Sequence, residues 1–381
     1  MIESKLPKVK TTIFATMSAL AQQHRAINLG QGFPDFHCDP KLIEEVNRAM
    51  LANCNQYPPM PGIEPLRSAI AKKTYTLYGA NYDVDHEITI TAGATQAIMT
   101  SILTVVRPGD EVIVIEPAYD SYIPSIELAG GIPVLFSMSL HEGQFSIDWD
   151  LLSKQINKKT RLIIVNSPHN PTGVTLEKSD YEQLANLLRG TNILLISDEV
   201  YEHMVFDGKA HYSVASHPEL AQRSFIISSF GKTYHVTGWK VGYVLAPKAL
   251  TKEFRKIHQF NVFTVNTPMQ YGLAAYMNDE RKYTELSDFY QEKRDFFRNG
   301  LSESRFKLLP VQGTYFQCVD YSAISNESEL EFASWLTSDI GVAAIPVSAF
   351  YQEQKQNHLI RFCFAKQKTT LERALERLIK I

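Results

Sequence analysis

Hydrophobic residues along the chain follow two patterns. Short apolar runs occupy residues 87–91, 111–115, 161–166, 192–197, 223–227 and 241–246. Longer runs with apolar residues at helical spacing occupy residues 11–23, 40–53, 64–78, 97–105 and 255–263. Continuously apolar strands that alternate with helices predict a mostly parallel sheet with helices on both faces. We therefore expect an α/β fold.

The C-terminal third predicts a second, smaller α/β domain. A helical stretch that starts at Met269 and continues through Tyr290 and Phe297 is expected to connect the two domains. Beyond it we expect strands within residues 313–319, 341–346 and 358–364, and a helix near 329–338. The predicted division is an N-terminal arm that joins the small domain (1–36), a large domain (37–270) and the small domain (271–381).

Polar side chains collect where the predicted strands end. Asn170, Asp198, Tyr201, Ser229 and Lys232 all lie at or just beyond a strand's C-terminal end. Because parallel sheets bind ligands at that edge, these residues predict one site. Lys232 lies among small and hydroxylated residues, where burial would lower the pKa of its amine and make it a nucleophile. The alternative is an ordinary lysine in a surface loop.

The predicted site also contains features suited to a phosphate. The segment 92–96 joins a strand to a helix through small residues, which leaves the backbone N–H groups of Ala94 and Thr95 free for an anion. Ser229 and Lys240 flank Lys232 in sequence and can complete a phosphate clamp. The predicted site therefore pairs a reactive lysine with a bound phosphate.

Composition narrows the possible functions. The chain has 381 residues, of which 44% are hydrophobic and 21% charged, and a net charge of −3. These values give no electrostatic case for binding nucleic acid or an anionic membrane. No apolar run approaches the ~20 residues of a membrane span. The four cysteines lack metal-ligand spacing, and the N-terminus lacks a signal-peptide core, so we expect a cytoplasmic protein without a metal.

Two segments resemble a known family. Ser229-x-x-Lys232 followed by Gly238-Trp239-Lys240-x-Gly242-Tyr243 resembles the pyridoxal-phosphate attachment segment of class I aminotransferases, which have the aspartate aminotransferase fold (fold type I). The segment 28–36, Asn-Leu-Gly-Gln-Gly-Phe-Pro-Asp-Phe, resembles the branch that contains kynurenine and bacterial methionine aminotransferases. Most family members carry Arg at the position of Lys240, but Lys is usual in this branch.

The resemblance implies roles in binding pyridoxal 5′-phosphate. Lys232 would carry the cofactor covalently and move the substrate's Cα proton. Asp198 would hold the proton on the ring nitrogen, Asn170 and Tyr201 would donate to the phenolate oxygen, and Tyr119 would stack on the ring. The phosphate would be held by Ala94, Thr95, Ser229, Lys240 and Tyr57. Tyr57 would come from a neighbouring subunit, which implies a homodimer with shared active sites.

The resemblance also implies a substrate site. Arg361, one cation within an apolar strand, would bind the α-carboxylate of the substrate; the alternative is a salt bridge within the small domain. Other implied substrate contacts are Gly32, Asn170, Phe14, Phe263 and Phe350. Phe14 is equally consistent with the core face of its helix. The aromatic side chains favour large uncharged amino acids such as methionine, phenylalanine, tyrosine or kynurenine.

The expected activity is therefore transfer of an α-amino group to a 2-oxo acid by a ping-pong mechanism. A carbon–sulfur β-lyase that acts on cysteine conjugates could use the same lysine. A pyridoxal-phosphate-binding regulator without turnover is disfavoured by the presence of Lys232 and Arg361. A nicotinamide dehydrogenase is disfavoured because no Gly-x-Gly-x-x-Gly follows a predicted strand.

Overall fold

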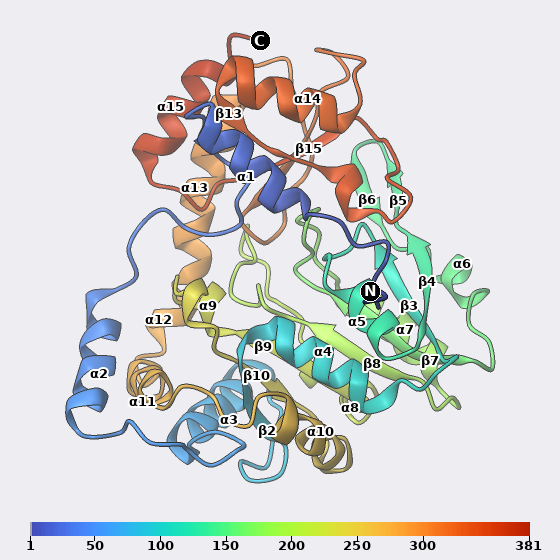
Figure 1. The fold of residues 1–381 in the computed structure, drawn as a ribbon, viewed down its shortest axis with the longest axis vertical. Coiled ribbons are helices and arrows are strands. Elements are labelled where there is room, and N and C mark those ends of the chain that lie inside the picture. Colours follow the sequence, from blue (N-terminus) through green and yellow to red (C-terminus); the bar gives the residue numbers. More distant parts are fainter. Residues whose placement is uncertain (1) are drawn as a thin grey trace.

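A seven-stranded sheet forms the centre of the larger part of the molecule. A computed structural model describes residues 2–381 (Figure 1). The strand order is β2 (Ile88–Thr91), β10 (Gly242–Leu245), β9 (Ser224–Ser229), β8 (Leu194–Asp198), β7 (Thr160–Asn166), β3 (Glu111–Glu116) and β4 (Ile132–Ser137). Only β10 runs antiparallel to its neighbours. The predicted α/β fold with a mostly parallel sheet is confirmed.

Helices cover both faces of this sheet, which explains why its strands are continuously apolar. Along β3, Val112 and Val114 face one core, which includes residues of α4 (Gly93–Val105), α5 (Tyr122–Leu128) and α10 (Lys248–Asn261). Ile113 and Ile115 face the opposite core. That core is shared with α3 (Glu64–Tyr78), α6 (Trp149–Ser153), α7 (Lys178–Leu188), α8 (Pro218–Ala221) and α11 (Thr267–Tyr276). The helix α2 (Pro40–Leu51) packs on α11, and β5 (Ser139–His141) and β6 (Gln144–Ser146) form a hairpin.

A smaller four-stranded sheet has its own core. Its order is β11 (Lys307–Leu308), β12 (Phe316–Asp320), β15 (Leu359–Cys363) and β14 (Ile345–Pro346). The core beside it includes residues of α1 (Ile13–Gln23), α13 (Leu286–Leu301), α14 (Glu329–Trp335) and α15 (Lys368–Leu378). The N-terminal strand β1 (Ile27–Asn28) pairs in parallel with β13 (Val342–Ala343). Figure 1 accordingly shows α1, in blue, among the red C-terminal elements. The domain boundaries given above stay a prediction.

The predicted continuous helical connector from Met269 onward is wrong. The chain forms three helices there, α11, α12 (Arg281–Thr284) and α13. The side chain of Asn266 caps the start of α11, and the turn that follows α11 contains Asn278 and Asp279, residue types that compete with helix by bonding to local backbone. The helix predicted near 329–338 ends at Trp335 and continues as a wide π-helical turn, Leu336–Ile340.

Within residues 2–381, no helix has both the length and the apolar character needed to cross a membrane. In the same part of the chain, no three His, Cys, Asp or Glu side chains are grouped so that they could hold a metal ion.

Candidate active site

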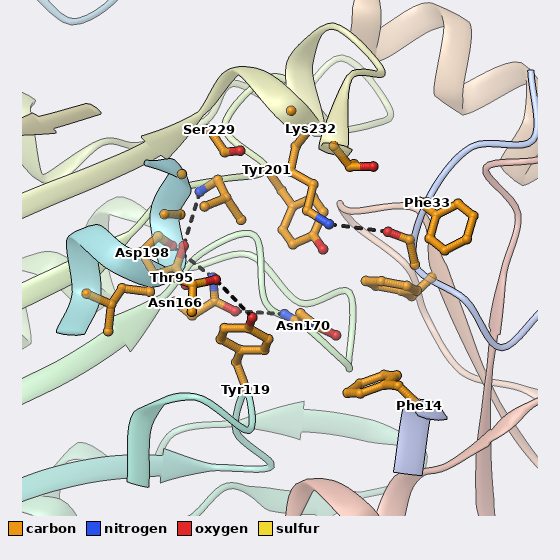
Figure 2. A pocket seen from close by; sticks show the side chains of 18 of the residues that line it. Phe14, Phe33, Thr95, Tyr119, Asn166, Asn170, Asp198, Tyr201, Ser229 and Lys232 are labelled. Carbon is orange, nitrogen blue, oxygen red and sulfur yellow. Dashed lines mark hydrogen bonds between the residues drawn. The ribbon is translucent and has the colours of Figure 1, made fainter. Parts of the chain in front are cut away.

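One cavity brings together most of the predicted site residues. It has a volume of about 300 Å³ and is lined from both sheets and from the N-terminal segment (Figure 2). The predicted residues that line it are Phe14, Gly32, Ala94, Thr95, Tyr119, Asn170, Asp198, Tyr201, Ser229, Lys232, Lys240 and Arg361. Tyr57, Phe263 and Phe350 do not line it. A cavity of this size suits a small-molecule ligand.

Lys232 lies in α9 (Phe230–Thr233), a single helical turn that directly follows β9. Its Nζ donates to the hydroxyl of Tyr315 at 2.9 Å and to the carbonyl of Gly32 at 3.2 Å. Burial lowers the pKa of Lys232 to about 8. The interpretation as an ordinary surface lysine is therefore wrong, and a substantial fraction of the amine is neutral near pH 8.

The start of α4 and Lys240 form a cradle for an anion. Gly93, with φ +78, begins the helix, and no side chain caps its first turn. The Nζ of Lys240 lies 3.5 Å from the position that a Cβ on Gly93 would take, so the ammonium group lies beside the start of the helix. The helix N-terminus and the ammonium group both attract negative charge. With Ser229 on the same wall, the cradle fits a phosphate group.

Asp198 is a buried carboxylate with hydrogen-bond donors, and no cation from residues 2–381 is paired with it. Tyr122 Oη donates to its Oδ2 at 2.6 Å, and the backbone N–H of Val200 donates to Oδ1 at 3.3 Å. Burial raises the pKa of Asp198 to about 6. A carboxylate in this state is stabilised by a ligand that presents a protonated ring nitrogen, because the ligand would supply the missing positive charge.

The hydroxyl of Tyr201 and the side-chain amide of Asn170 line the same cavity as this carboxylate. Tyr201 follows β8 by three residues, and burial raises the pKa of its phenol, so the hydroxyl stays protonated and able to donate. Asn170 Oδ1 accepts from Arg361, which leaves the amide N–H groups of Asn170 as its donors. Both residues can therefore donate to an oxygen on a bound ring, as the sequence predicted.

Arg361 lies in β15, and no carboxylate in the described part of the chain pairs with it. Its Nη1 donates to Asn170 Oδ1 at 2.6 Å and its Nη2 to the carbonyl of Gly30 at 3.2 Å, whereas Nε has no hydrogen-bond partner among residues 2–381. The guanidinium centre lies 3.8 Å from the ring centre of Phe316. The predicted alternative of a salt bridge within the small domain is therefore wrong. A buried cation at a cavity wall fits a ligand carboxylate.

The predicted aromatic residues divide into two groups. Phe14 lines the cavity and meets Phe350 edge to face, with ring centres 5.8 Å apart; Phe350 itself is buried behind the cavity wall. Tyr57 and Phe263 form an edge-to-face pair with ring centres 5.3 Å apart and are 81% and 43% exposed. A single chain therefore does not bring this pair to its own cavity.

Several lining residues were missed by the sequence reasoning. Asn166 is the last residue of β7; its Oδ1 accepts from the backbone N–H of Asn170 and its Nδ2 donates to the carbonyl of Asp198, both at 2.8 Å. The strand-end rule that identified Asp198 could have found it. Phe33 and Phe316 also line the cavity. No motif marked Phe316, because its position depends on how the two sheets face each other, or Tyr122, which reaches Asp198 from α5 on the large sheet.

Comparison with known proteins places the chain in a family. A model of the family described as "Aminotransferase class I and II" matches residues 24–378. The methionine aminotransferase of Escherichia coli K12 is 50% identical over 377 residues, which is 99% of this chain and 97% of that protein. The human kynurenine–oxoglutarate transaminase 1 is 34% identical over 394 residues, which is 95% of this chain and 93% of that protein.

Solved structures agree with the sequence relatives. The crystal structure of YbdL from Escherichia coli, described as identifying a methionine aminotransferase function, has a TM-score of 0.98, 49% identity and full coverage of both chains. The structure of N-succinyldiaminopimelate aminotransferase from Mycobacterium tuberculosis has a TM-score of 0.95 and 39% identity, again over both whole chains. These two structures share the fold of this chain but are named for different amino-acid substrates.

Proposed function

The chain belongs to the class I and II aminotransferases, and from that premise we propose that it binds pyridoxal 5′-phosphate and transfers the amino group of methionine, or of another large uncharged amino acid, to a 2-oxo acid. The observation that carries the proposal is one cavity that holds a buried lysine of lowered pKa, a buried carboxylate and an unpaired arginine. These three groups match the demands of amino-group transfer.

Each part of the cavity would hold one part of the cofactor. Ser229, Lys240 and the N–H groups at the start of α4 would bind the phosphate, and Asp198 would hold the proton on the ring nitrogen. Asn170 and Tyr201 would donate to the phenolate oxygen, and Tyr119 would stack on the ring. When bound, pyridoxal phosphate supplies an electron-withdrawing ring that stabilises the charge left on Cα after proton removal.

Lys232 would have two tasks. Its neutral amine is the nucleophile for covalent attachment of the cofactor, and its lowered pKa makes that form available near neutral pH. When free, the same amine would take the proton from the substrate's Cα and later return it as an acid. A pKa of about 8 suits both directions of this transfer.

Arg361 would select the α-carboxylate, and the remaining wall would select the side chain. The cations that line the cavity are Lys232, Lys240 and Arg361, and each has a role already. Among the residues that the structure describes, no further cation lines the wall to bind a second substrate carboxylate, whereas Phe14, Phe33 and Phe316 offer apolar surface. This supports a preference for large uncharged donors over aspartate, and two of the relatives above are named for methionine and kynurenine.

A second copy of the chain would complete the site. Tyr57 and Phe263 are exposed, as are Phe260 (90%) and Leu51 (89%) nearby in sequence. Tyr57 and Phe263 contact each other at the surface, and large apolar side chains that are exposed as a group mark a surface that another chain covers. We infer a homodimer in which Tyr57 reaches the partner's phosphate and Phe263 the partner's substrate. A monomer at micromolar concentration in size-exclusion chromatography with light scattering would contradict it.

The test of substrate class is a set of single half-reactions. The protein loaded with pyridoxal phosphate is mixed with methionine, phenylalanine, kynurenine or aspartate, and formation of the pyridoxamine form is followed by absorbance. We expect the three large uncharged donors to react at least about tenfold faster than aspartate, because one unmatched buried carboxylate costs more than about 1.4 kcal/mol. Faster reaction with aspartate would contradict the proposed substrate class. Release of pyruvate and ammonia from a cysteine conjugate would instead indicate the β-lyase, which no observation here favours.

A further inference from the structure

Tyr315 contacts the reactive lysine from behind the cavity. It lies just before β12, its side chain is fully buried, and it is not among the residues that line the cavity. Its hydroxyl donates to the carbonyl of Gly32 at 2.6 Å and accepts from Lys232 Nζ at 2.9 Å. The lysine's amine therefore bonds to a residue that the cofactor itself would not touch.

The directions of these hydrogen bonds follow from chemistry. The Gly32 carbonyl can only accept, and a phenol has one hydrogen, so the hydroxyl of Tyr315 must accept from Lys232. A neutral amine has two hydrogens, and here they have two acceptors, Tyr315 Oη and the Gly32 carbonyl at 3.2 Å. With both hydrogens directed to that wall, the lone pair of Nζ points away from it, toward the cavity. Figure 2 shows Lys232 extended toward the loop that carries Phe33.

We infer that Tyr315 is a positioning residue that orients the neutral Lys232 amine so that its lone pair faces the reacting carbon. The inference rests on the proposed function, because it concerns the lysine that would carry pyridoxal phosphate. It assigns the small sheet a direct part in the reaction. Tyr315 would act whenever the amine is free, both before covalent attachment and during proton transfer at Cα.

The wall that accepts these hydrogen bonds is itself fixed. Lys366 Nζ donates to the carbonyls on either side of Gly32, at 2.7 Å to Phe33 and 3.3 Å to Gln31. The ring of Phe316 lies so close to Gly32 that a Cβ there would sit 3.0 Å from it. A lysine side chain has four rotatable bonds, so its amine is oriented only if the groups that accept its hydrogen bonds are themselves fixed.

The phenol ring is also held in place. Tyr201 meets the ring of Tyr315 edge to face at 5.2 Å, and the ring of Tyr290 lies 5.6 Å from it. The charged and titratable groups that act on the Lys232 amine are Asp198, Arg361, Lys240 and Cys363. Replacing Tyr315 by Phe leaves these four groups and the ring in place, and it removes a hydroxyl that accepts from Lys232, donates to the Gly32 carbonyl and acts on the phenol of Tyr201.

The test uses the full-length protein freed of cofactor, in wild type, Tyr315→Phe and Tyr290→Phe. The hydroxyl of Tyr290 is buried and has no hydrogen-bond partner among residues 2–381, so Tyr290→Phe removes a neighbouring phenol oxygen without removing a contact. The rate of covalent attachment of pyridoxal phosphate to Lys232 is measured from pH 6 to pH 10 by borohydride reduction and mass spectrometry. The affinity for pyridoxamine phosphate, which cannot attach covalently, reports separately on the integrity of the cavity.

Positioning predicts a specific pattern. For Tyr315→Phe, the plateau rate at high pH, where the amine is neutral in every variant, falls about tenfold. The pyridoxamine phosphate affinity stays within about twofold, since Tyr315 does not line the cavity. The midpoint of the pH profile moves down, because the ammonium form loses a hydrogen-bond acceptor. In the holoenzyme, kcat falls while KM stays nearly constant. Tyr290→Phe matches wild type in all four measurements.

Three results would overturn the inference. The first is a plateau rate in Tyr315→Phe that equals that of wild type. The second is a loss of pyridoxamine phosphate affinity as large as the loss of attachment rate. The third is a pH-profile midpoint that rises toward the pKa of an ordinary lysine, because water has entered beside Lys232. Failure of the proposed function is a different result: wild type would then attach no pyridoxal phosphate at Lys232. The two failures are therefore distinguishable within one experiment.

Discussion

Asp198→Asn should make the cofactor-free protein more stable at neutral pH. Burial raises the pKa of Asp198 to about 6, whereas an unfolded chain has an Asp pKa of about 3.9. Because the folded value is the higher one, the protonated carboxyl stabilises the fold at low pH, and this contribution is lost as the pH rises from about 4 to about 6. The loss amounts to about 3 kcal/mol at neutral pH.

An asparagine keeps the shape of the carboxyl and stays neutral. It can still accept from Tyr122, whose hydroxyl lies 2.6 Å from Oδ2, and its NH2 group replaces Oδ1, which loses the long 3.3 Å hydrogen bond from the backbone N–H of Val200. We therefore expect the free energy of unfolding of the variant to exceed that of wild type at pH 7.5. The difference should grow by roughly 1 to 2 kcal/mol between pH 5 and pH 7.5, since about half of the penalty is already present at pH 5.

The assay is urea unfolding of the cofactor-free proteins at several pH values, with Glu202→Gln as a control of opposite sign. Burial alone would raise the pKa of Glu202, but Lys73 at 2.6 Å and His203 outweigh it and hold that pKa well below its usual range. Glu202→Gln leaves Lys73 buried without its carboxylate and should lose about 3 to 5 kcal/mol at pH 7.5. A difference between Asp198→Asn and wild type that does not change with pH would refute the reasoning.

Three further variants test the binding of the substrate and of the cofactor. Arg361→Lys replaces a guanidinium that donates two hydrogen bonds by a point charge. For the amino-acid substrate, kcat/KM should fall by an amount that corresponds to about 2 kcal/mol, seen as a raised KM. An unchanged KM would contradict the carboxylate role. Gly93→Ala places a side chain at φ +78 beside Lys240 and should weaken cofactor affinity by about 1 to 2 kcal/mol in a titration. The control is Gly79→Ala, which is also at positive φ but has open space around it, and it should leave cofactor affinity unchanged. Lys366→Met removes the ammonium group that donates to the Gln31 and Phe33 carbonyls. For the amino-acid substrate, kcat/KM should fall by an amount that corresponds to about 1 kcal/mol, with no change in cofactor affinity. A loss of cofactor affinity alone would contradict this prediction.

The apolar pattern predicted the central sheet well because its strands are buried on both faces. β3, β7 and β8 lie within one or two residues of the runs that predicted them. The connector was wrong because helical spacing continues on both sides of Asn278 and Asp279, so periodicity alone does not show the turn between α11 and α12. Short strands such as β13 and β14 depend on partners far away in the sequence.

The site was predictable where strand ends defined it. Asp198, Ser229 and Lys232 lie at the C-terminal edge of the sheet that the pattern predicted. The lack of a carboxylate beside Arg361 is visible only in three dimensions, because every acidic residue of the chain is a potential partner until the fold is known. Tyr315 carried no signal at all, since its role depends on the approach of the small sheet to α9.

The central claim is that Lys232 carries pyridoxal phosphate and uses it to transfer an amino group. The direct measurement is the absorption spectrum of the purified protein with pyridoxal phosphate, recorded before and after methionine and again after a 2-oxo acid. We predict a visible-edge band that converts to the pyridoxamine band with methionine, returns with the 2-oxo acid and is absent in Lys232→Ala. No protein-bound band in wild type, or the same band and the same cycle in Lys232→Ala, would contradict the claim.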